Sequence, residues 1–298
     1  MNYNKNHVIA IFQALLVTLL WSSSFVIIKI GLSEIPPLLF AGLRYFIAFL
    51  VLLPVLLQKK YRNEIAGITK TQWIKLSLLG IVFICLTQGA QFVGLSLLPS
   101  VTVSLWLNFT PVIVAVLGIF FLNEIPTSKQ WLGVSLFIAG VFVYFIPVSF
   151  EGNLFLGLIV MTVGVFANAS ASIQGREINR DKNLSPIVVT GISMGVGSII
   201  LLAFGFSYQS IESISPSNII LLLWMAVVNT AFAFTLWNKT LRTLTAIESV
   251  LINNTMLIQI ALLAWIFLGE TISFKEAIGM LIAVVGIFFV QTGKRRNI

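Results

Sequence analysis

Long stretches without a single charged residue constrain this chain more than any other feature. An apolar helix needs roughly 20 residues to cross the hydrocarbon core of a bilayer, which is about 30 Å thick. Seven uncharged stretches reach that length, at residues 8–28, 76–123, 130–150, 152–175, 183–211, 213–238 and 249–269. The stretch from 76 to 123 is long enough for two crossings. The sequence therefore predicts an all-α membrane protein, with the lipid bilayer as its solvent.

The composition excludes several classes of soluble protein. Of the 298 residues, 58% are apolar and 9% are charged, whereas about a quarter are charged in soluble domains. The net charge of +8 does not indicate a nucleic-acid partner, because the Lys and Arg residues lie between the apolar stretches. The single cysteine, Cys85, excludes an internal disulfide and a cysteine-based metal site. We expect no metal and no cofactor.

The chain contains an internal repeat. Residues 123–140 recur at residues 269–286, a constant 146 positions later. In each copy an apolar helix ends, a short polar turn follows, and the next helix begins with a capping box. The matched pairs and boxes are Glu124/Glu270, Lys129/Lys275, Gly133/Gly279, Gly140/Gly286, Thr127-x-x-Gln130 and Ser273-x-x-Glu276. One half of the protein is therefore predicted to be a copy of the other.

Turn residues and charges divide the chain into ten predicted transmembrane helices. They lie near 8–30, 36–57, 73–94, 99–122, 129–147, 154–176, 185–206, 217–238, 245–268 and 275–292. The first five form repeat 1, residues 1–149, and the other five form repeat 2, residues 150–298. Because five is odd, the second repeat must enter the membrane with the opposite orientation. Inverted repeats are typical of transporters that bind a solute near the bilayer midplane.

The distribution of Lys and Arg predicts the orientation. With a cytoplasmic N-terminus, fifteen of these residues fall in cytoplasmic segments and only Lys275 falls in an outside loop, with Lys29 and Arg44 on helices near that side. Positive charge is enriched in cytoplasmic loops. Both termini are therefore expected in the cytoplasm.

These features resemble the drug/metabolite transporter superfamily with two EamA-type domains. The resemblance rests on ten helices in inverted halves, the Trp21-Ser22-Ser23-Ser24-Phe25 stretch, Arg44, and the Glu124 and Glu270 turns before glycine-spaced final helices. It covers essentially the whole chain. It implies a solute carrier of a bacterial inner membrane, often an exporter of amino acids or other metabolites, with its cavity between the two halves.

Two charged residues within the predicted helices are candidates for the site. Arg44 lies about eight residues into its helix, where a charge costs about 2.5–3.5 kcal/mol on insertion scales. Its guanidinium could bind a carboxylate of the solute, or it could bond backbone carbonyls at a helix end. Glu248 could carry a coupling proton, or it could cap its helix through Thr245-x-x-Glu248.

Polar and aromatic residues supply the other candidates. Amides and hydroxyls that faced hydrocarbon would be left without partners, so we expect them to face the bundle interior. They could contact the solute or join helices to one another. The predicted solute-binding set is Trp21, Ser24, Arg44, Tyr45, Gln88, Gln91, Trp106, Asn108, Asn168, Asn229, Glu248, Asn254, Thr255 and Gln259. Gly133, Gly140, Gly279 and Gly286 suit close helix packing within the bundle or in a homodimer.

The sequence predicts a secondary transporter that exports a small polar metabolite such as an amino acid by alternating access. It has no nucleotide-binding loop and no G-x-S-x-G motif, and its only histidine, His7, precedes the first helix, so it is not expected to be an enzyme or an ATP-driven pump. One alternative is proton-coupled efflux of cationic drugs with Glu248 as the proton site. Another is an intramembrane enzyme that acts on a lipid-linked substrate.

Overall fold

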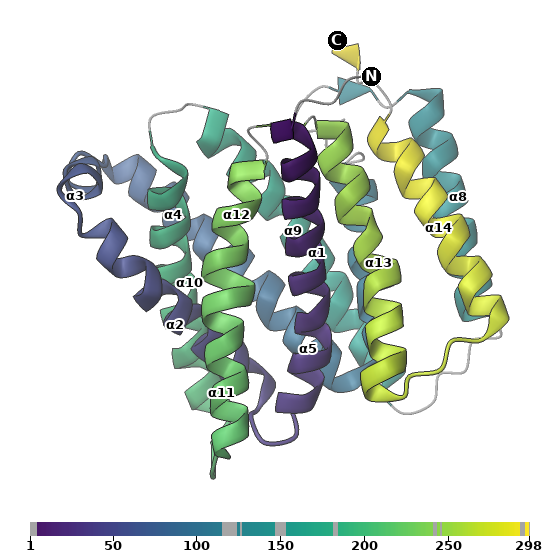
Figure 1. Ribbon diagram of the computed structural model, residues 1–298, viewed down its shortest axis with the longest axis horizontal. Helices are drawn as coiled ribbons and strands as arrows, with labels where there is room; N and C mark the ends of the chain where they lie inside the picture. Colours follow the sequence, from purple (N-terminus) through teal and green to yellow (C-terminus); the bar gives the residue numbers. More distant parts are fainter. Residues whose placement is uncertain are drawn as a thin grey trace. The chain divides into compact units, whose positions relative to one another are not determined.

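A computed structural model describes residues 5–114, 124–125, 127–146, 153–180, 184–240, 243–244, 246–292 and 296–297. These residues are almost entirely helical (Figure 1). The helices are α1 (Lys5–Gly31), α2 (Pro37–Leu56), α3 (Lys59–Ala66), α4 (Lys70–Gly80), α5 (Gly89–Leu97), α6 (Ser100–Leu107), α8 (Ser128–Phe145), α9 (Leu154–Arg180), α10 (Pro186–Tyr208), α11 (Pro216–Trp224), α12 (Ala233–Thr240), α13 (Ala246–Leu268) and α14 (Phe274–Thr292), with π-helices η1 (Ile81–Gln88) and η2 (Met225–Phe232). Two short strands, β1 (Glu124–Ile125) and β2 (Arg296–Asn297), pair antiparallel.

Seven helices in the described part of the chain are long and apolar enough to span a membrane. They cover Asn6–Gly31, Pro37–Leu56, Lys70–Leu97, Ser128–Phe145, Leu154–Gly175, Pro186–Tyr208 and Pro216–Trp237. Shorter apolar helices cover Ser100–Val114 and Thr255–Leu268. The predicted class, an all-helical membrane protein, is therefore confirmed. The sequence analysis missed α3, for which it predicted no helix between residues 57 and 73.

The described helices form two compact units, and each unit takes segments from both sequence repeats. Unit 1 consists of Met1–Val26, Leu98–Leu156 and Ala233–Ile298. Unit 2 consists of Ile27–Leu97 and Gly157–Phe232. Helices that are distant in sequence thus pack together within each unit.

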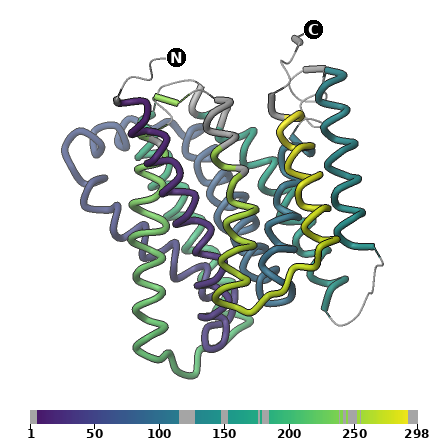
Figure 2. The backbone as a smooth tube through the Cα atoms, turned by 45° about the vertical axis from the view of Figure 1, so that its right-hand side comes forward, coloured from purple at the N-terminus to yellow at the C-terminus, as the bar shows by residue number. Residues whose placement is uncertain are grey.

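Unit 1 contains a close antiparallel contact between α8 and α14, which lie side by side in Figures 1 and 2. The glycines predicted for close packing form this contact within a single chain. A Cβ atom at Gly140 would lie 2.5 Å from the Ala283 amide nitrogen and 2.6 Å from the Gly279 carbonyl oxygen. A Cβ atom at Gly133 would lie 2.6 Å from the Gly286 carbonyl oxygen. The two helix backbones therefore touch, and no side chain fits between them.

Unit 2 contains the π-helix η1 and the π-helix η2, each within a longer membrane helix. In η1 the Thr87 hydroxyl donates to the Val82 carbonyl oxygen at 3.0 Å, and in η2 the Thr230 hydroxyl donates to the Met225 carbonyl oxygen at 2.9 Å. Both bonds reach back five residues, which matches the wider turn of a π-helix. Such turns are frequent at functional sites because they change which side chains face a neighbouring helix.

Side chains from distant segments cap several helix starts. The Glu34 carboxylate accepts the Ser215 N–H at 2.7 Å, and Glu64 accepts the Ser185 N–H. In unit 1 both Glu270 oxygens accept the Ser100 N–H, at 2.9 and 3.0 Å. Hydrogen bonds from Asn218 and then from Ser215 hold the pKa of Glu34 below its usual value. Each cap satisfies a backbone donor that the first turn of a helix leaves without a partner.

Both capping boxes of the internal repeat are confirmed, while Thr245 of the third predicted box lies outside the described residues. Thr127 accepts the Gln130 N–H at 3.4 Å while its own N–H donates to the Gln130 side chain at 2.9 Å. The Ser273 hydroxyl accepts the Glu276 N–H at 3.2 Å, and the Ser273 N–H donates back to the Glu276 carboxylate at 2.6 Å. The described α8 and α14 therefore begin where the repeat predicted.

The α8–α14 contact predicts that Gly140→Ala lowers stability. The added methyl group must push the two backbones apart, which costs about 1–3 kcal/mol in a well-packed core. Thermal unfolding in detergent measures the effect. Gly175→Ala is the matched control, since a Cβ atom there would lie 4.0 Å from its nearest neighbour, Leu79. Equal melting temperatures for the two variants would contradict the packing account.

Candidate functional site

Arg44 and Tyr45 lie at the centre of a polar cluster in unit 2. Arg44 is 4% exposed and Tyr45 is 2% exposed, although α2 is otherwise apolar. The Arg44 Nε–H donates to the Thr230 hydroxyl oxygen at 2.9 Å, and the Tyr45 hydroxyl donates to Gln88 Oε1 at 2.7 Å. The structure thus brings together three predicted residues from α2 and η1, with Thr230 from η2.

The π-helix η2 orients the acceptor that holds Arg44. The Thr230 hydroxyl gives its own proton to the Met225 carbonyl, so its oxygen lone pairs are available to the guanidinium. The guanidinium carbon also lies 5.4 Å from the centroid of the Tyr45 ring. A guanidinium held by its Nε–H keeps its planar fork in one orientation, and this fork matches a carboxylate or a phosphate. The cluster can therefore recognise an anionic group.

A second polar cluster, in unit 1, joins α1 to α13 through Gln259. The Gln259 side-chain amide donates to Thr255 at 2.9 Å and to Thr18 at 3.2 Å, and its Oε1 accepts from Ser22 at 3.0 Å. The Thr18 and Thr255 hydroxyls donate in turn to the carbonyls of Leu15 and Ile252. Both N–H groups of Gln259 are therefore used within the protein.

Trp21 lies beside this cluster in an aromatic group. Its ring centroid lies 5.3 Å from Phe234 and 5.3 Å from Trp237, and both pairs of rings are tilted. Its indole N–H is buried and has no hydrogen-bond partner among the described residues. A buried indole N–H without an acceptor is costly, and a solute oxygen could satisfy it.

A third group in unit 1 surrounds Trp106 near the end of α6. The Trp106 ring packs against Phe109 at 5.1 Å and Phe145 at 5.8 Å between centroids. The Asn108 amide donates to the Ser104 carbonyl at 2.8 Å, so it closes its own helix end.

The predicted residue Ser24 lies in α1, where it is buried and donates to the Leu20 carbonyl at 3.3 Å.

The remaining predicted residues have less defined surroundings. Asn229 is buried in η2 next to Thr230, while Gln91 in α5 and Asn168 in α9 are partly buried. Glu248 and Asn254 belong to α13, but their side chains lie outside the described part of the structure. Sequence analysis missed Thr230, Thr18 and Phe234 as members of these clusters. Thr230 directly follows Asn229, which was the only available signal.

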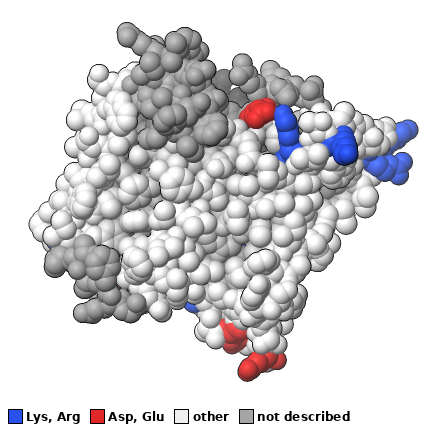
Figure 3. Space-filling model, turned by 180° about the vertical axis from the view of Figure 1, so that it is seen from behind, with Lys and Arg blue, Asp and Glu red and all other residues white. Residues whose placement is uncertain are grey.

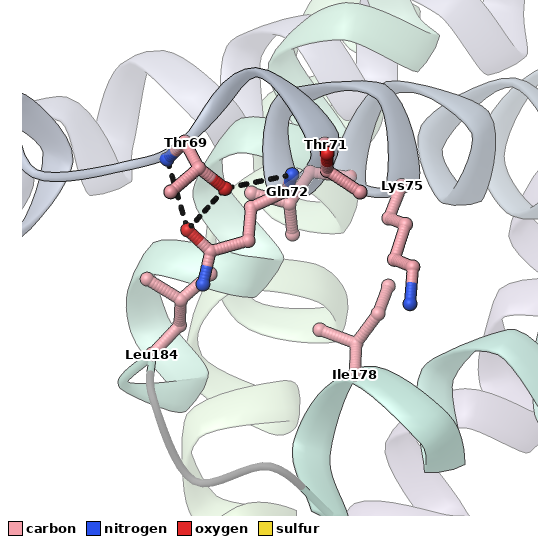
Figure 4. Close-up of a pocket in the computed structure, with 7 residues that line it drawn as sticks. Thr69, Thr71, Gln72, Lys75, Ile178 and Leu184 are labelled. Atoms are coloured by element: carbon pink, nitrogen blue, oxygen red, sulfur yellow. Dashed lines mark hydrogen bonds between the residues drawn. The ribbon is translucent and has the colours of Figure 1, made fainter.

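Neither of two cavities in the structure contains a predicted site residue. The first, of about 210 Å³, lies in unit 2 and is lined by Thr69, Thr71, Gln72, Lys75, Leu76, Ile178 and Leu184 (Figure 4). The second, of about 480 Å³, is an apolar groove between α13 and α14 in unit 1, lined mainly by residues such as Leu262, Trp265 and Leu281. Within the described ranges no group of His, Cys, Asp and Glu side chains could hold a metal ion.

Comparison with known proteins identifies a transporter family. The family model described as "EamA-like transporter family" matches residues 8–146 and again residues 155–292. The chain is 26% identical over 289 residues to the "Uncharacterized transporter YoaV" of Bacillus subtilis (strain 168), covering 95% of this chain and 97% of that protein. A solved crystal structure matches with a TM-score of 0.68 at 17% identity, over 94% of this chain and 96% of that one.

Two further relatives have names that state a cargo. The "Probable amino-acid metabolite efflux pump" of Salmonella typhimurium (strain LT2) is 26% identical over 295 residues, which cover 95% of each chain. The "S-adenosylmethionine/S-adenosylhomocysteine transporter" of Chlamydia muridarum (strain MoPn / Nigg) is 25% identical over 274 residues, covering 88% of this chain and 85% of that protein. Both relatives span nearly the same length as this protein.

The Gln259 cluster predicts that Gln259→Leu destabilises the protein in the absence of any solute. The substitution leaves the buried Ser22 hydroxyl without its acceptor, and an unmatched buried polar group costs about 1–3 kcal/mol. A lower melting temperature in solute-free detergent is the expected result. Gln91→Leu serves as the control, because the partly buried Gln91 side chain has no hydrogen bond to another described residue, so no such loss is expected. Equal effects of the two substitutions would contradict the account.

Proposed function

Since this chain belongs to the EamA-like transporter family, within the drug/metabolite transporter superfamily, we propose that it exports amino acids or similar small polar metabolites. It is a multi-pass membrane transporter and not an enzyme. The proposed mechanism is secondary transport by alternating access, in which the solute site opens to one side of the membrane at a time. The following observations support the cargo and the mechanism.

The buried guanidinium of Arg44 is the observation that carries the proposed cargo. It lies in an apolar helix, where burying a charge is costly, and a charge kept at such a position is a candidate for a functional role. Its hydrogen bond to Thr230 and its position over the Tyr45 ring fix the orientation of the fork. A solute carboxylate that approached this fork would form charge-assisted hydrogen bonds. We propose that Arg44 binds the carboxylate, with Tyr45 and Gln88 beside it.

The cargos named for the relatives support this choice. One is named for amino-acid metabolites and another for S-adenosylmethionine and S-adenosylhomocysteine. These compounds share an α-amino acid group, which carries a carboxylate. The other predicted residues are proposed as further contacts to the cargo or its path, apart from Gln259, whose amide is fully engaged between α1 and α13.

The proposed topology has ten crossings in two inverted repeats, residues 1–149 and 150–298. The predicted helix ranges agree with the bounds of α1, α2, α8, α9, α10 and α14 to within a few residues. The repeated hairpins and their capping boxes support the two copies. The Lys and Arg distribution supports cytoplasmic termini. The match to the EamA-like family and to bacterial relatives supports a bacterial inner membrane.

Flux measurements on purified protein in proteoliposomes test the proposed cargo. A panel of radiolabelled amino acids is offered with and without an imposed pH gradient. We expect saturable flux, and we expect Arg44→Ala to raise the half-saturation concentration roughly 10- to 150-fold, the equivalent of about 1.5–3 kcal/mol for a hydrogen bond to a charged group. Acceleration by the gradient is the result expected for proton coupling.

Two controls separate binding from folding. Arg44→Lys keeps the charge but loses the planar fork, so we expect a smaller rise in the half-saturation concentration. Lys239→Gln removes a cation from the exposed part of α12 and is expected to leave flux unchanged. Melting temperatures confirm that each variant is folded. Unchanged amino-acid flux in folded Arg44→Ala protein would contradict the role of Arg44, and absent flux in wild type would contradict the cargo.

A further inference from the structure

The helix α3 has an apolar side that packs onto unit 2. It is eight residues long and follows α2 after a two-residue connection. Tyr61 and Ile65 in α3, with Ile68 just beyond it, contact a buried cluster that includes Leu56 and Val188. The helix is therefore fixed at the end of two membrane-spanning segments, α2 and the segment that starts at α4.

The opposite side of α3 is positively charged. Lys59, Lys60 and Arg62 are exposed, and Lys70 is exposed at the start of α4. We call these four residues the basic strip. Figure 3 shows Lys and Arg side chains gathered at the corner of the visible face where α3 lies, with an acidic patch beside them and further acidic side chains at the lower end of that face. The Lys60 ammonium lies 5.3 Å from the centroid of the Tyr61 ring, which holds it near the helix surface.

The described acidic residues near the basic strip are engaged elsewhere. The Glu64 carboxylate accepts the Ser185 N–H at the start of α10. The Glu177 carboxylate pairs with Lys75 at 2.7 Å, and the Lys75 side chain lines the small cavity shown in Figure 4. Among the described residues, neither carboxylate forms an ion pair with Lys59, Arg62 or Lys70. This surface therefore retains a positive charge that a ligand can neutralise.

Exposed apolar side chains place the basic strip at a membrane boundary. Leu57 is 60% exposed just before α3, and Ile74 is 58% exposed on the first turns of α4. Trp73 is also exposed, and tryptophan is enriched where hydrocarbon meets the headgroups. Basic residues next to such a boundary attract anionic lipids, and each contributes about 1 kcal/mol near the surface.

We propose that α3 and the start of α4 form a binding surface for the headgroups of anionic phospholipids. In this arrangement Leu57, Trp73 and Ile74 contact acyl chains while the basic strip contacts the phosphates. This contact places α3 at the depth of the lipid headgroups, and it fixes the depth of unit 2 in the bilayer. The combination of cations with lipid-exposed apolar residues fits a lipid better than a soluble acidic protein, which would leave those apolar residues uncovered. This inference does not depend on the transported solute.

Native mass spectrometry of the purified full-length protein tests the proposal. Phosphatidylglycerol and phosphatidylcholine are titrated separately into the detergent-solubilised protein. Wild type is expected to bind phosphatidylglycerol more tightly, and K59Q/K60Q/R62Q is expected to lose at least tenfold in phosphatidylglycerol affinity, since about 1 kcal/mol per cation corresponds to roughly fivefold each. Its affinity for phosphatidylcholine should not change.

The control K129Q/K239Q/K275Q removes the same charge from exposed lysines of unit 1. It should keep the preference for phosphatidylglycerol. Melting temperatures report folding, and the single variants Lys59→Gln and Arg62→Gln, each expected to lose about fivefold, replace the triple variant if it unfolds. Equal binding of both lipids to wild type, or equal losses in the two triple variants, would overturn the proposal.

Discussion

The structure depends on side chains that satisfy backbone donors at the starts of helices distant in sequence. The first turn of every helix leaves N–H groups that need acceptors from outside the helix. Here side chains distant in sequence supply them: Glu34 caps at Ser215, Gln209 at Leu38 and Leu39, and Glu270 at Ser100. Each cap joins one sequence repeat to the other within a single contact unit. The hydrogen bonds that cap these helices therefore also join the two sequence repeats.

The same requirement explains how charged and amide side chains are accommodated. Arg44 is held by Thr230, whose orientation comes from the π-helical turn of η2. Gln259 has both N–H groups and its oxygen engaged between α1 and α13, so its main contribution is to hold those helices together. Arg44 presents a charge in an apolar helix and is suited to an anionic ligand. The proposed role in recognition therefore falls on the guanidinium, and the amide cluster supports the surrounding helices.

Local patterns predicted more of the fold than of the site. Apolar runs, proline and capping boxes depend on neighbours in sequence, and they located the described membrane helices and the starts of α8 and α14. The glycine spacing predicted close helix packing, but it did not predict that α8 and α14 pack against each other within one chain. The Glu270 cap on Ser100 and the Arg44–Thr230 bond join residues far apart in sequence, so a single sequence does not reveal them. The π-helices were not predicted either, although their Thr87 and Thr230 hydrogen bonds reach back only five residues. The short, charged α3 lacked the length and apolar content used to find helices.

Solute counterflow tests the central claim, that this protein is a carrier with alternating access, most directly. Proteoliposomes are loaded with a high concentration of an unlabelled amino acid that the protein transports, and are diluted into a trace of the labelled compound. A carrier with a single alternating site accumulates label transiently above its outside concentration, because unlabelled solute competes for exit. The account predicts this overshoot in the wild-type protein and predicts that the Arg44→Ala variant loses it. Label that only equilibrates, without an overshoot, would contradict alternating access.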